Sequence, residues 1–394
     1  MDNPANNIKV IHIASGDRWA GAEAQVFTLL KTLNQRSDIS VYAVILNEGE
    51  LANKLQKVGI NTTVLNEAQL SSWQILLRLR ALFQSIQPNI IHTHRLKENV
   101  LASIANLINN AKAAVTQSTT QRTKAALVAT IHGDSEHHYP LWKLHKHAPQ
   151  WINWLCTRLL YKKLIAVSKD LAEKLSKKYP QHLLQVIENG IDIEAVQQAA
   201  NSSHFATDPN IQHHIGIAGR LEQVKRVDIF LDTAKLLINS SPKNTWHFHI
   251  FGEGSLEATL KAQTQTNAIT KNVTFHGHRN DIASCLKAMD CLIMCSDHEG
   301  LPMTPLESIA VGTPVVAHSV GGLVDIIGEY CGGALVADHQ PQGYAQAVSQ
   351  LFSNEQQLEN SKKNGLERIE RSYTAQTNSQ TLFSVYQALT STKF

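Results

Sequence analysis

The sequence predicts an α/β protein built from two domains, each with a doubly wound parallel sheet. Short apolar segments typical of strands alternate with segments of helical periodicity along most of the 394 residues. The alternation forms two series, separated at residues 201–212 by a stretch rich in Ser, Asn, Asp and Pro. Because a chain of this length exceeds one ordinary core, we interpret the two series as two domains.

The first series begins with an apolar strand at residues 8–14, a glycine-containing loop at 15–21 and a helix at 22–33, where apolar residues recur at helical spacing. Further strands of this series are expected at residues 41–46, 62–65, 90–94, 127–132 and 164–167. Strands of the second series are expected at residues 215–218, 247–251, 273–276, 291–294, 315–317 and 334–336, followed by helices of which the last covers 375–389.

Composition restricts the function classes. Apolar residues make up 43% of the chain and charged residues 18%, as in folded globular proteins, and the net charge of +3 is too small to indicate nucleic acid as a partner. Five scattered cysteines without metal-ligand spacing indicate a reducing compartment. The start of the chain lacks the pattern of a signal peptide, and no apolar run reaches the ~18 residues of a membrane span. We therefore expect a cytoplasmic protein.

Two segments interrupt the alternation. Residues 109–126, rich in Thr, Gln, Ser and Ala, are expected to form an extended polar loop. Residues 139–163 mix Trp142, Trp151, Trp154 and Tyr161 with Lys and Arg. This mixture is typical of a surface that rests on anionic lipid, and equally of a helix whose tryptophans pack on the sheet. The first alternative adds peripheral binding to the inner face of the cytoplasmic membrane.

The stretch from Asp297 to Ala317 has the strongest character of a binding site. An apolar strand leads into a loop with Glu299 and Gly300, and a helix begins near Thr304. Loops that enter helices from the carboxyl ends of parallel strands bind ligands, and the free N–H groups of the first helical turn attract anions. Glu307, in the first turns of this helix, is either a ligand contact or a residue that complements the helix dipole.

Other strand ends carry further candidate residues. Arg220 and Lys225 follow the first strand of the second series and could neutralise a diphosphate, although a solvated charge run would look the same. His132 ends a strand and could act as a general acid or base, or as a donor to a sugar hydroxyl. Gly21 and Gly252 lie in strand-end turns where a ligand could approach the backbone closely. Together these residues predict a nucleotide-diphosphate compound bound mainly to the second domain.

Several motifs occur in the order found in a known family. They are Gly21-Ala22-Glu23, Ile91-His92-Thr93-His94, His132-Gly133, Ala166-Val167-Ser168, Asn189-Gly190-Ile191-Asp192, Gly219-Arg220-Leu221 with Lys225, Gly252-Glu253-Gly254, and Glu299 through Glu307 followed by Gly312-Thr313-Pro314-Val315-Val316. With these motifs the sequence resembles the retaining glycosyltransferases of family 4, over nearly the whole chain. The resemblance implies the GT-B fold, in which two Rossmann-like domains face each other across a cleft.

The resemblance also implies roles for these residues. Arg220 and Lys225 would hold the donor diphosphate and stabilise the charge that grows as the nucleotide leaves. Glu307 would accept hydrogen bonds from the ribose, and Glu299 would contact hydroxyls of the transferred sugar. The remaining residues assigned to donor binding are Gly21, Gly252 and the loop Gly300, Leu301, Met303 and Thr304, and His132 would lie beside the donor sugar.

The family generally lacks a metal-binding Asp-x-Asp element, and none is evident in this sequence. The expected reaction therefore uses no metal or other cofactor, only a UDP- or GDP-sugar donor and a glycan or lipid-linked acceptor, in polysaccharide or lipopolysaccharide assembly. The expected domains are residues 1–205 on the acceptor side, 206–372 for the nucleotide sugar, and a helix at 373–394 that crosses back. Two alternatives remain: a nucleotide-sugar epimerase of the same fold, which would need acid and base carboxylates from both domains, and a sugar-nucleotide-binding scaffold without catalysis.

Three positions depart from the family pattern. Ala20 precedes Gly21 where a second glycine is frequent, and Pro302 removes one N–H from the phosphate loop. Arg226 follows Lys225 where glycine or asparagine is common. None of these changes removes a charged group of the site, so we expect an active enzyme.

Overall fold

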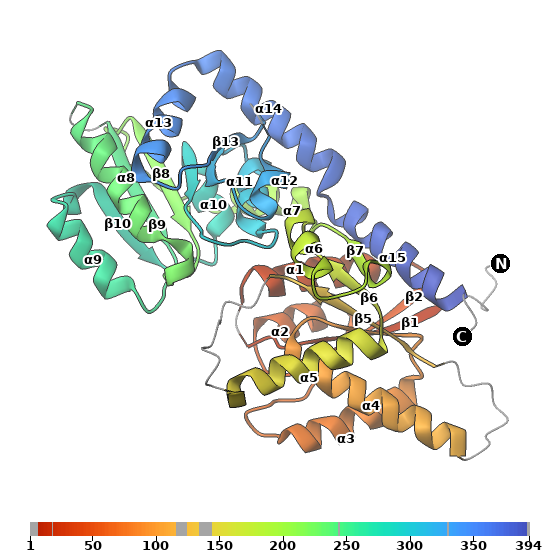
Figure 1. Cartoon of the computed structure of the whole chain (residues 1–394). Coiled ribbons are helices and arrows are strands. Elements are labelled where there is room, and N and C mark those ends of the chain that lie inside the picture. Colours follow the sequence, from red (N-terminus) through yellow and green to blue (C-terminus); the bar gives the residue numbers. More distant parts are fainter. Residues whose placement is uncertain are drawn as a thin grey trace. The chain divides into compact units, whose positions relative to one another are not determined.

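The computed structural model describes residues 7–17, 19–115, 124–133, 144–242, 245–328 and 331–391. The chain forms two compact units, one made of residues 1–190 with 375–394 and the other of residues 191–374 (Figure 1). Each unit contains one parallel sheet with helices packed against it. Two Rossmann-like domains, as predicted, are therefore present.

The first unit contains a seven-stranded sheet in the order β3-β2-β1-β4-β5-β6-β7, and all of its described pairings are parallel. The order reverses between β1 and β4, which is the switch point at which sheets of this kind bind ligands. Its strands are β1 (Ile8–Ala14), β2 (Ile39–Ile45), β3 (Asn61–Val64), β4 (Ile90–Thr93), β5 (Ala126–Ile131), β6 (Tyr161–Ala166) and β7 (Leu184–Val186). Its helices are α1 (Gly21–Leu33), α2 (Glu50–Lys57), α3 (Ser72–Ile86), α4 (Leu96–Val115), α5 (Leu144–Leu160), α6 (Lys169–Ser176) and α15 (Ala375–Ser391).

The second unit repeats the arrangement with six strands in the order β10-β9-β8-β11-β12-β13, again parallel. Its switch point lies between β8 and β11. The strands are β8 (His213–Ala218), β9 (Trp246–Phe251), β10 (Val273–Gly277), β11 (Cys291–Met294), β12 (Val315–His318) and β13 (Gly333–Val336). The helices are α7 (Ile193–Ser202), α8 (Val227–Asn239), α9 (Glu257–Thr266), α10 (Ile282–Lys287), α11 (Met303–Ala310), α12 (Gly322–Ile326), α13 (Pro341–Phe352) and α14 (Glu355–Ser372).

The predicted strands agree with the observed ones to within a few residues, but two predictions differ from the structure. β7 was not predicted, since it has only three residues and no clear alternation. The polar loop expected at 109–126 is wrong for its first part, because α4 continues to Val115 and Ala126 already begins β5. Alanines and a lysine favour helix there although the segment lacks an apolar stripe. Residues 116–123 of the expected loop lie outside the described residues.

The helices form where apolar residues recur on one face. In α1 the buried residues Val26, Leu29, Leu30 and Leu33 follow the spacing of a helix that packs one stripe on a sheet. α3 begins at a capping box in which Ser71 and Gln74 each accept a hydrogen bond from the other residue's backbone N–H. Apolar spacing and local caps of this kind set where the helices form and begin.

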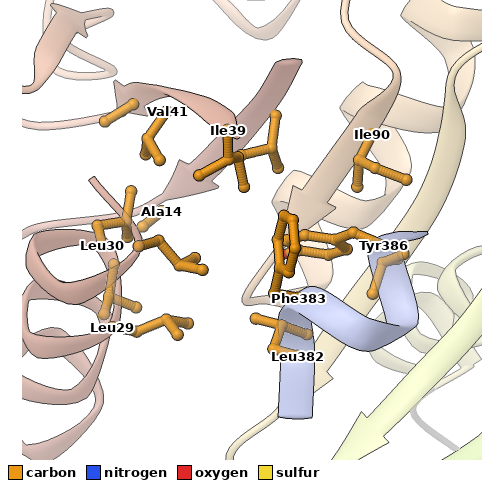
Figure 2. Close-up of a cluster of buried hydrophobic side chains, with 14 of the residues drawn as sticks. Ala14, Leu29, Leu30, Ile39, Val41, Ile90, Leu382, Phe383 and Tyr386 are labelled. Carbon is orange, nitrogen blue, oxygen red and sulfur yellow. The ribbon is translucent and has the colours of Figure 1, made fainter. Parts of the chain in front are cut away.

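The C-terminal helix α15 belongs to the core of the first unit. Figure 2 shows Leu382, Phe383 and Tyr386 of α15 among apolar side chains from α1, β1, β2 and β4. The Asn378 side chain, on the same helix, accepts a hydrogen bond from Gln25 and donates one to the Glu188 carbonyl. The last helix thus completes the apolar layer over β1 and β4, although it is far from them in sequence.

The boundary between the units lies between residues 190 and 191, before α7, which packs on α10 and α11 and so belongs to the second unit. The Gln197 side chain donates to the carbonyl of Ala310 at the end of α11. The second core lies between α8, α13 and the sheet, with Phe230, Phe248 and Tyr344 fully buried.

Candidate active site

The predicted donor-binding residues of the second unit lie along the carboxyl edge of its sheet. β8 ends at Ala218, β9 at Phe251 and β11 at Met294, and a loop follows each strand. Because parallel strands all end at one edge, the segments that carry Arg220, Gly252 and Glu299 are brought to the same side of the sheet. A small hollow at this edge is bordered by residues 217–221, Lys225 and residues 294–296.

Glycines allow these loops to approach each other closely. Gly252 has φ +135°, and a Cβ atom there would lie 1.9 Å from the carbonyl oxygen of Gly219. A Cβ on Gly254 would lie 2.4 Å from the carbonyl oxygen of Leu221. Gly219 in turn donates its N–H to the Phe251 carbonyl at 2.9 Å. The loops after β8 and β9 are therefore in backbone contact, which leaves no room for side chains between them.

Lys225 and Glu299 form the central ion pair of this edge. The Lys225 Nζ lies 2.6 Å from Glu299 Oε1, and the two side chains keep only 21% and 9% of their surface exposed. Lys225 ends a short 3-10 turn, Gln223–Lys225, whose geometry directs its chain past Gly219. Arg220, on the same loop, is exposed at the surface. This edge of the sheet therefore carries Lys225, which is ion-paired, and Arg220, which is exposed, close to the shielded carboxylate of Glu299.

The departure at Arg226 has a structural explanation. Arg226 adopts φ +47° and ψ +46°, the left-handed conformation that glycine and asparagine adopt most readily. Its guanidinium donates to Asp228 and to Asp297, and these carboxylates raise its pKa. The Arg226 guanidinium is therefore engaged in holding the turn.

Helix α11 presents the remaining donor-binding candidates. Its N-cap residue is Pro302, which has no N–H, so the first donors come from Met303 and Thr304. Leu301 and Met303 are buried. The Gly300 carbonyl accepts from the N–H of Gly322 at 2.7 Å, which fixes the loop before the helix.

Glu307 is a carboxylic acid with a strongly altered environment. Burial raises the pKa of its carboxyl group to about 7, although part of the side chain remains accessible. Among the described residues, its carboxylate has neither an ion pair nor a hydrogen bond. An acceptor that is desolvated and unpaired is suited to hydroxyl groups of a ligand.

The first unit holds the other two predicted residues. Gly21 begins α1 directly after the β1 loop and is exposed. His132 follows β5, and its Nε2 lies 3.2 Å from Nδ1 of His94. Burial, and secondarily Arg95, lower the pKa of His132 to about 4. Its Nδ1 is enclosed without a hydrogen-bond partner among the described residues.

Sequence reasoning missed a group of buried polar side chains near His132. The Glu98 carboxylate accepts the backbone N–H groups of His94 and Arg95, and burial raises its pKa to about 8. Arg95 also forms ion pairs with Glu23 and Asp17. One oxygen each of Glu23 and Glu98 is buried without a partner in the described chain. The sequence signal that could have indicated this buried polar group is the presence of polar residues inside apolar strands, such as His12 and His92.

In the described parts of the chain, no three or more His, Cys, Asp or Glu residues are placed to hold a metal ion. The same residues contain no helix that is long and apolar enough to cross a bilayer.

Comparisons with known proteins identify the family of this chain. Residues 19–195 match the family described as Glycosyltransferase Family 4, and residues 201–368 match Glycosyl transferases group 1. The chain belongs to the family 4 glycosyltransferases. The two matches together cover most of both units, including every residue assigned to the site, and the fold is GT-B.

Relatives of this glycosyltransferase act on several glycans. An Escherichia coli UDP-Gal:alpha-D-GlcNAc-diphosphoundecaprenol alpha-1,3-galactosyltransferase is 24% identical over 82% of both chains. The lipopolysaccharide core biosynthesis mannosyltransferase LpsB of Rhizobium meliloti is 25% identical over 52% of this chain and 60% of its own length. The crystal structure of Anabaena HepE in complex with UDP superposes with a TM-score of 0.77 at 18% identity, covering 97% of this chain and 100% of that one.

Proposed function

We propose that this glycosyltransferase moves a hexose, with retention of configuration, from a nucleoside-diphosphate sugar to a glycan or lipid-linked acceptor. The observation that carries the proposal is the Lys225–Glu299 pair, placed beside Arg220 and the start of α11 at one sheet edge. Relatives named for UDP-galactose, lipid-linked GlcNAc and lipopolysaccharide core support a UDP-sugar donor and a role in cell-envelope polysaccharide or lipopolysaccharide synthesis. HepE, whose structures contain UDP and UDP-glucose, also favours UDP over GDP.

In this proposal each group at the edge has one role. Lys225 and Arg220 bind the diphosphate, and the free N–H groups at the start of α11 add to its binding. Glu307 accepts from the ribose hydroxyls. Glu299 keeps Lys225 in position before the donor arrives and then contacts hydroxyls of the transferred sugar. Gly21 and His132 contribute from the first unit.

The proposed reaction proceeds by attack on the same face of the sugar from which the nucleotide departs. The leaving phosphate takes the proton of the acceptor hydroxyl, and the C1–O bond to the new acceptor forms as the C1–O bond to phosphate breaks. Lys225 and Arg220 stabilise the negative charge that develops on the diphosphate. No pair of carboxylates at glycosidase spacing is needed in this scheme, and the two cations take the place of a divalent metal ion.

A donor screen tests the proposal. The purified protein is incubated with UDP- and GDP-hexoses, with and without envelope glycan acceptors, and products are identified by mass spectrometry. We expect acceptor-dependent release of UDP and a product with the α-configuration of the donor. Measurable donor binding without turnover would instead establish a scaffold, and interconversion of the donor sugar itself would establish an epimerase.

We also propose that the first unit rests on an anionic membrane surface through α5. On α5 the side chains of Trp151, Leu155 and Leu159 follow each other at intervals of four residues and are exposed, Trp151 by 64% and Leu159 by 68%. The exposed cation Arg158 lies beside this stripe. The alternative that all tryptophans of this helix are buried does not hold for Trp151. Residues 139–143 of the predicted segment lie outside the described residues.

The neighbouring helices extend this apolar surface. α4 packs against both α3 and α5, and Figure 1 shows the three side by side. Most large apolar side chains that are exposed in the described chain belong to them: Trp73, Leu77, Ile104, Leu107, Trp151, Ile152, Leu155 and Leu159. Such a concentration is unusual for a surface that faces only water.

Vesicle sedimentation tests this contact. The double variant Trp151→Ser, Leu159→Ser should lose most of its binding to vesicles with anionic lipid, because the buried apolar area supplies much of the affinity. Val324→Ser, which changes another exposed apolar side chain, on α12 of the second unit, is the control and should bind like the wild type. Equal sedimentation of all three proteins at low salt would exclude α5 as the contact.

A further inference from the structure

Six buried or half-buried side chains of the first unit form a continuous chain of hydrogen bonds that ends at His132. We call it the histidine network. His12 lies on β1, His92 on β4 and Thr130 on β5. His94 and His132 directly follow β4 and β5, and Tyr386 lies on α15. Figure 2 shows Tyr386 directed from α15 toward β4. The proposed reaction uses only His132 of this set.

The bonds can be followed from one end to the other. Thr130 Oγ1 lies 2.7 Å from Nε2 of His92, whose Nδ1 lies 2.5 Å from the Tyr386 hydroxyl. The same hydroxyl lies 3.1 Å from Nε2 of His12. The chain then continues from His12 Nδ1 to His94 Nε2 at 3.1 Å, and from His94 Nδ1 to His132 Nε2 at 3.2 Å.

The four rings are neutral at physiological pH. Burial lowers the pKa of His12 to about 3 and that of His132 to about 4. The pKa values of His92 and His94 are also lowered well below the usual range, again chiefly by burial. A neutral imidazole has one N–H donor and one bare nitrogen, so each ring passes a hydrogen bond on in a single direction.

The network can be satisfied in either of two directions. In one, every ring carries its proton on Nε2, Thr130 accepts from His92, and Nδ1 of His132 is bare. In the other, every ring carries its proton on Nδ1, Thr130 donates, and His132 presents an N–H. All five hydrogen bonds are kept in both, because hydroxyl groups and imidazoles can each donate or accept. Reversal takes up one proton at His132 Nδ1 and releases one from Thr130 Oγ1, so the proton count of the network is unchanged.

A second set of histidines provides a contrast. In the second unit His214, His249 and His276 are linked by two ring-to-ring bonds of 2.9 Å. That chain ends where His214 Nε2 meets the carbonyl oxygen of Asp208, which can only accept. All three rings must then carry their protons on Nε2, and this chain cannot reverse.

The free protein has a preferred direction. With the proton on Nδ1, His132 would hold a buried N–H without an acceptor in the described residues, which is costly. The opposite direction leaves a bare nitrogen there and places the one unpartnered hydrogen on Thr130 Oγ1. A hydroxyl hydrogen can rotate toward the cavity that Thr130 borders, whereas a ring N–H cannot turn, so this direction costs less. A cavity bordered by both Thr130 and His132 has about 10 Å³ of space, close to the lower limit for one water, which could exchange the proton.

We propose that the histidine network is a reversible hydrogen-bond relay that decides whether His132 carries a bare Nδ1 or an Nδ1–H. This atom is enclosed in the free protein, and a sugar hydroxyl that reaches it would meet an acceptor or a donor accordingly. His12, His92, His94, Thr130 and Tyr386 are positioning residues in this relay, since none of them touches the sugar. The contact of His132 with a sugar rests on the function proposed above, but the relay itself is a property of the free protein. A ligand atom that can only accept a hydrogen bond requires an N–H on His132 Nδ1. Its binding would therefore reverse the direction of the network while all five hydrogen bonds are kept.

The test is the proton position on His132 in free, full-length protein labelled with ¹⁵N-histidine. Long-range ¹H–¹⁵N spectra distinguish protonated from bare ring nitrogens, and His132→Gln identifies the His132 signals. In the wild type we expect His132 in the Nε2–H form. In Tyr386→Phe the chain is cut, and His12, His94 and His132 form a separate segment. This segment has one unpartnered N–H in either direction, on His12 when the protons are on Nε2 and on His132 when they are on Nδ1. The preference therefore disappears, and the His132 signals should shift toward equal populations of both forms.

Two controls separate the relay from general loosening of the core. Tyr161→Phe removes a buried hydroxyl of the same unit that bonds Thr93 and Asn99 outside the network, and it should leave the His132 signals unchanged. The His249 and His276 signals should stay constant in all variants. If Tyr386→Phe does not fold, Thr130→Val should produce the same shift and Thr130→Ser should restore the wild-type spectrum.

An unchanged His132 proton position in both Tyr386→Phe and Thr130→Val would overturn the relay. Because these spectra need no substrate, that result would leave the transferase proposal intact. Conversely, a failed donor screen would leave the relay standing.

Discussion

At the scale of residues, the short contact between Lys225 and Glu299 shows how the site is held without a ligand. Each charge is largely shielded from water and would be costly without the other. A diphosphate offers Lys225 a second anion, so the lysine can move toward it while the carboxylate turns to sugar hydroxyls. In the proposed function, this exchange would explain why an acidic residue lies inside a site for an anion.

Replacing Lys225 with alanine tests its role. We expect turnover to fall by about 10²–10³-fold, because one lost contact to developing charge costs about 3–4 kcal/mol. Steady-state rates with the donor found in the screen measure this effect. Lys261→Ala is the control, since Lys261 pairs with Glu257 on the exposed side of α9. A Lys225→Ala enzyme with near wild-type turnover would remove this lysine from the diphosphate site.

Glu307 predicts a pH dependence of donor binding. Its folded pKa is raised to about 7, so the carboxyl is largely protonated below that pH and loses strength as an acceptor for the ribose hydroxyls. The donor KM should therefore rise as the pH falls from 8 to about 6 and be lower at alkaline pH. In Glu307→Gln the KM should be raised at every pH and this slope should be absent. A slope that persists in the variant would assign it to another group.

At the scale of elements, the site depends on how closely strand-end loops approach each other. The loops after β8 and β9 meet at backbone positions where only glycine fits, and the loop before α11 is joined by the N–H of Gly322 to the Gly300 carbonyl. These contacts fix the places of Lys225 and the start of α11. The glycines therefore determine geometry and do not need to touch the donor.

Two glycine variants separate close approach from backbone conformation. Gly252→Ala should destabilise the second unit strongly and abolish donor binding, because the new Cβ would clash with the Gly219 carbonyl. Gly312→Ala also places alanine at positive φ, +89°, but its Cβ meets nothing within 4 Å, so it should cost only about 1–2 kcal/mol. Chemical denaturation and donor titration measure both effects. Equal losses in the two variants would show that loop contact is unimportant.

At the scale of the whole molecule, the chain consists of two units with separate apolar cores. The first core is incomplete without α15, which comes from the end of the chain. This connectivity makes the stability of the first unit depend on residues that follow the entire second unit in sequence.

Core truncations in the two units should act locally. Phe383→Ala on α15 and Phe230→Ala on α8 each remove a fully buried ring and should cost about 3–5 kcal/mol. Hydrogen exchange followed by mass spectrometry should show faster exchange in β1 and β4 for the first variant, and in β8 and β9 for the second. Faster exchange in both sheets for either variant would mean that the units unfold as one.

The sequence by itself determined the fold class, nearly every strand, and the family. Strands and helices could be predicted because alternation, apolar spacing and capping residues act over a few residues. The exceptions were β7, too short for a pattern, and residues 109–115, helical without an apolar stripe. The assigned site residues could be placed on strand ends, and their roles stay predictions.

Only the tertiary structure decided which side chains meet across strands. No local pattern links Tyr386 with His12 and His92, or Lys225 with Glu299, because these contacts join residues far apart in the chain. Burial also changed the chemistry of groups that look ordinary in sequence, raising the pKa of Glu307 and lowering that of His132. Sequence fixes local structure through short-range backbone preferences, whereas charge state and proton position depend on the three-dimensional surroundings.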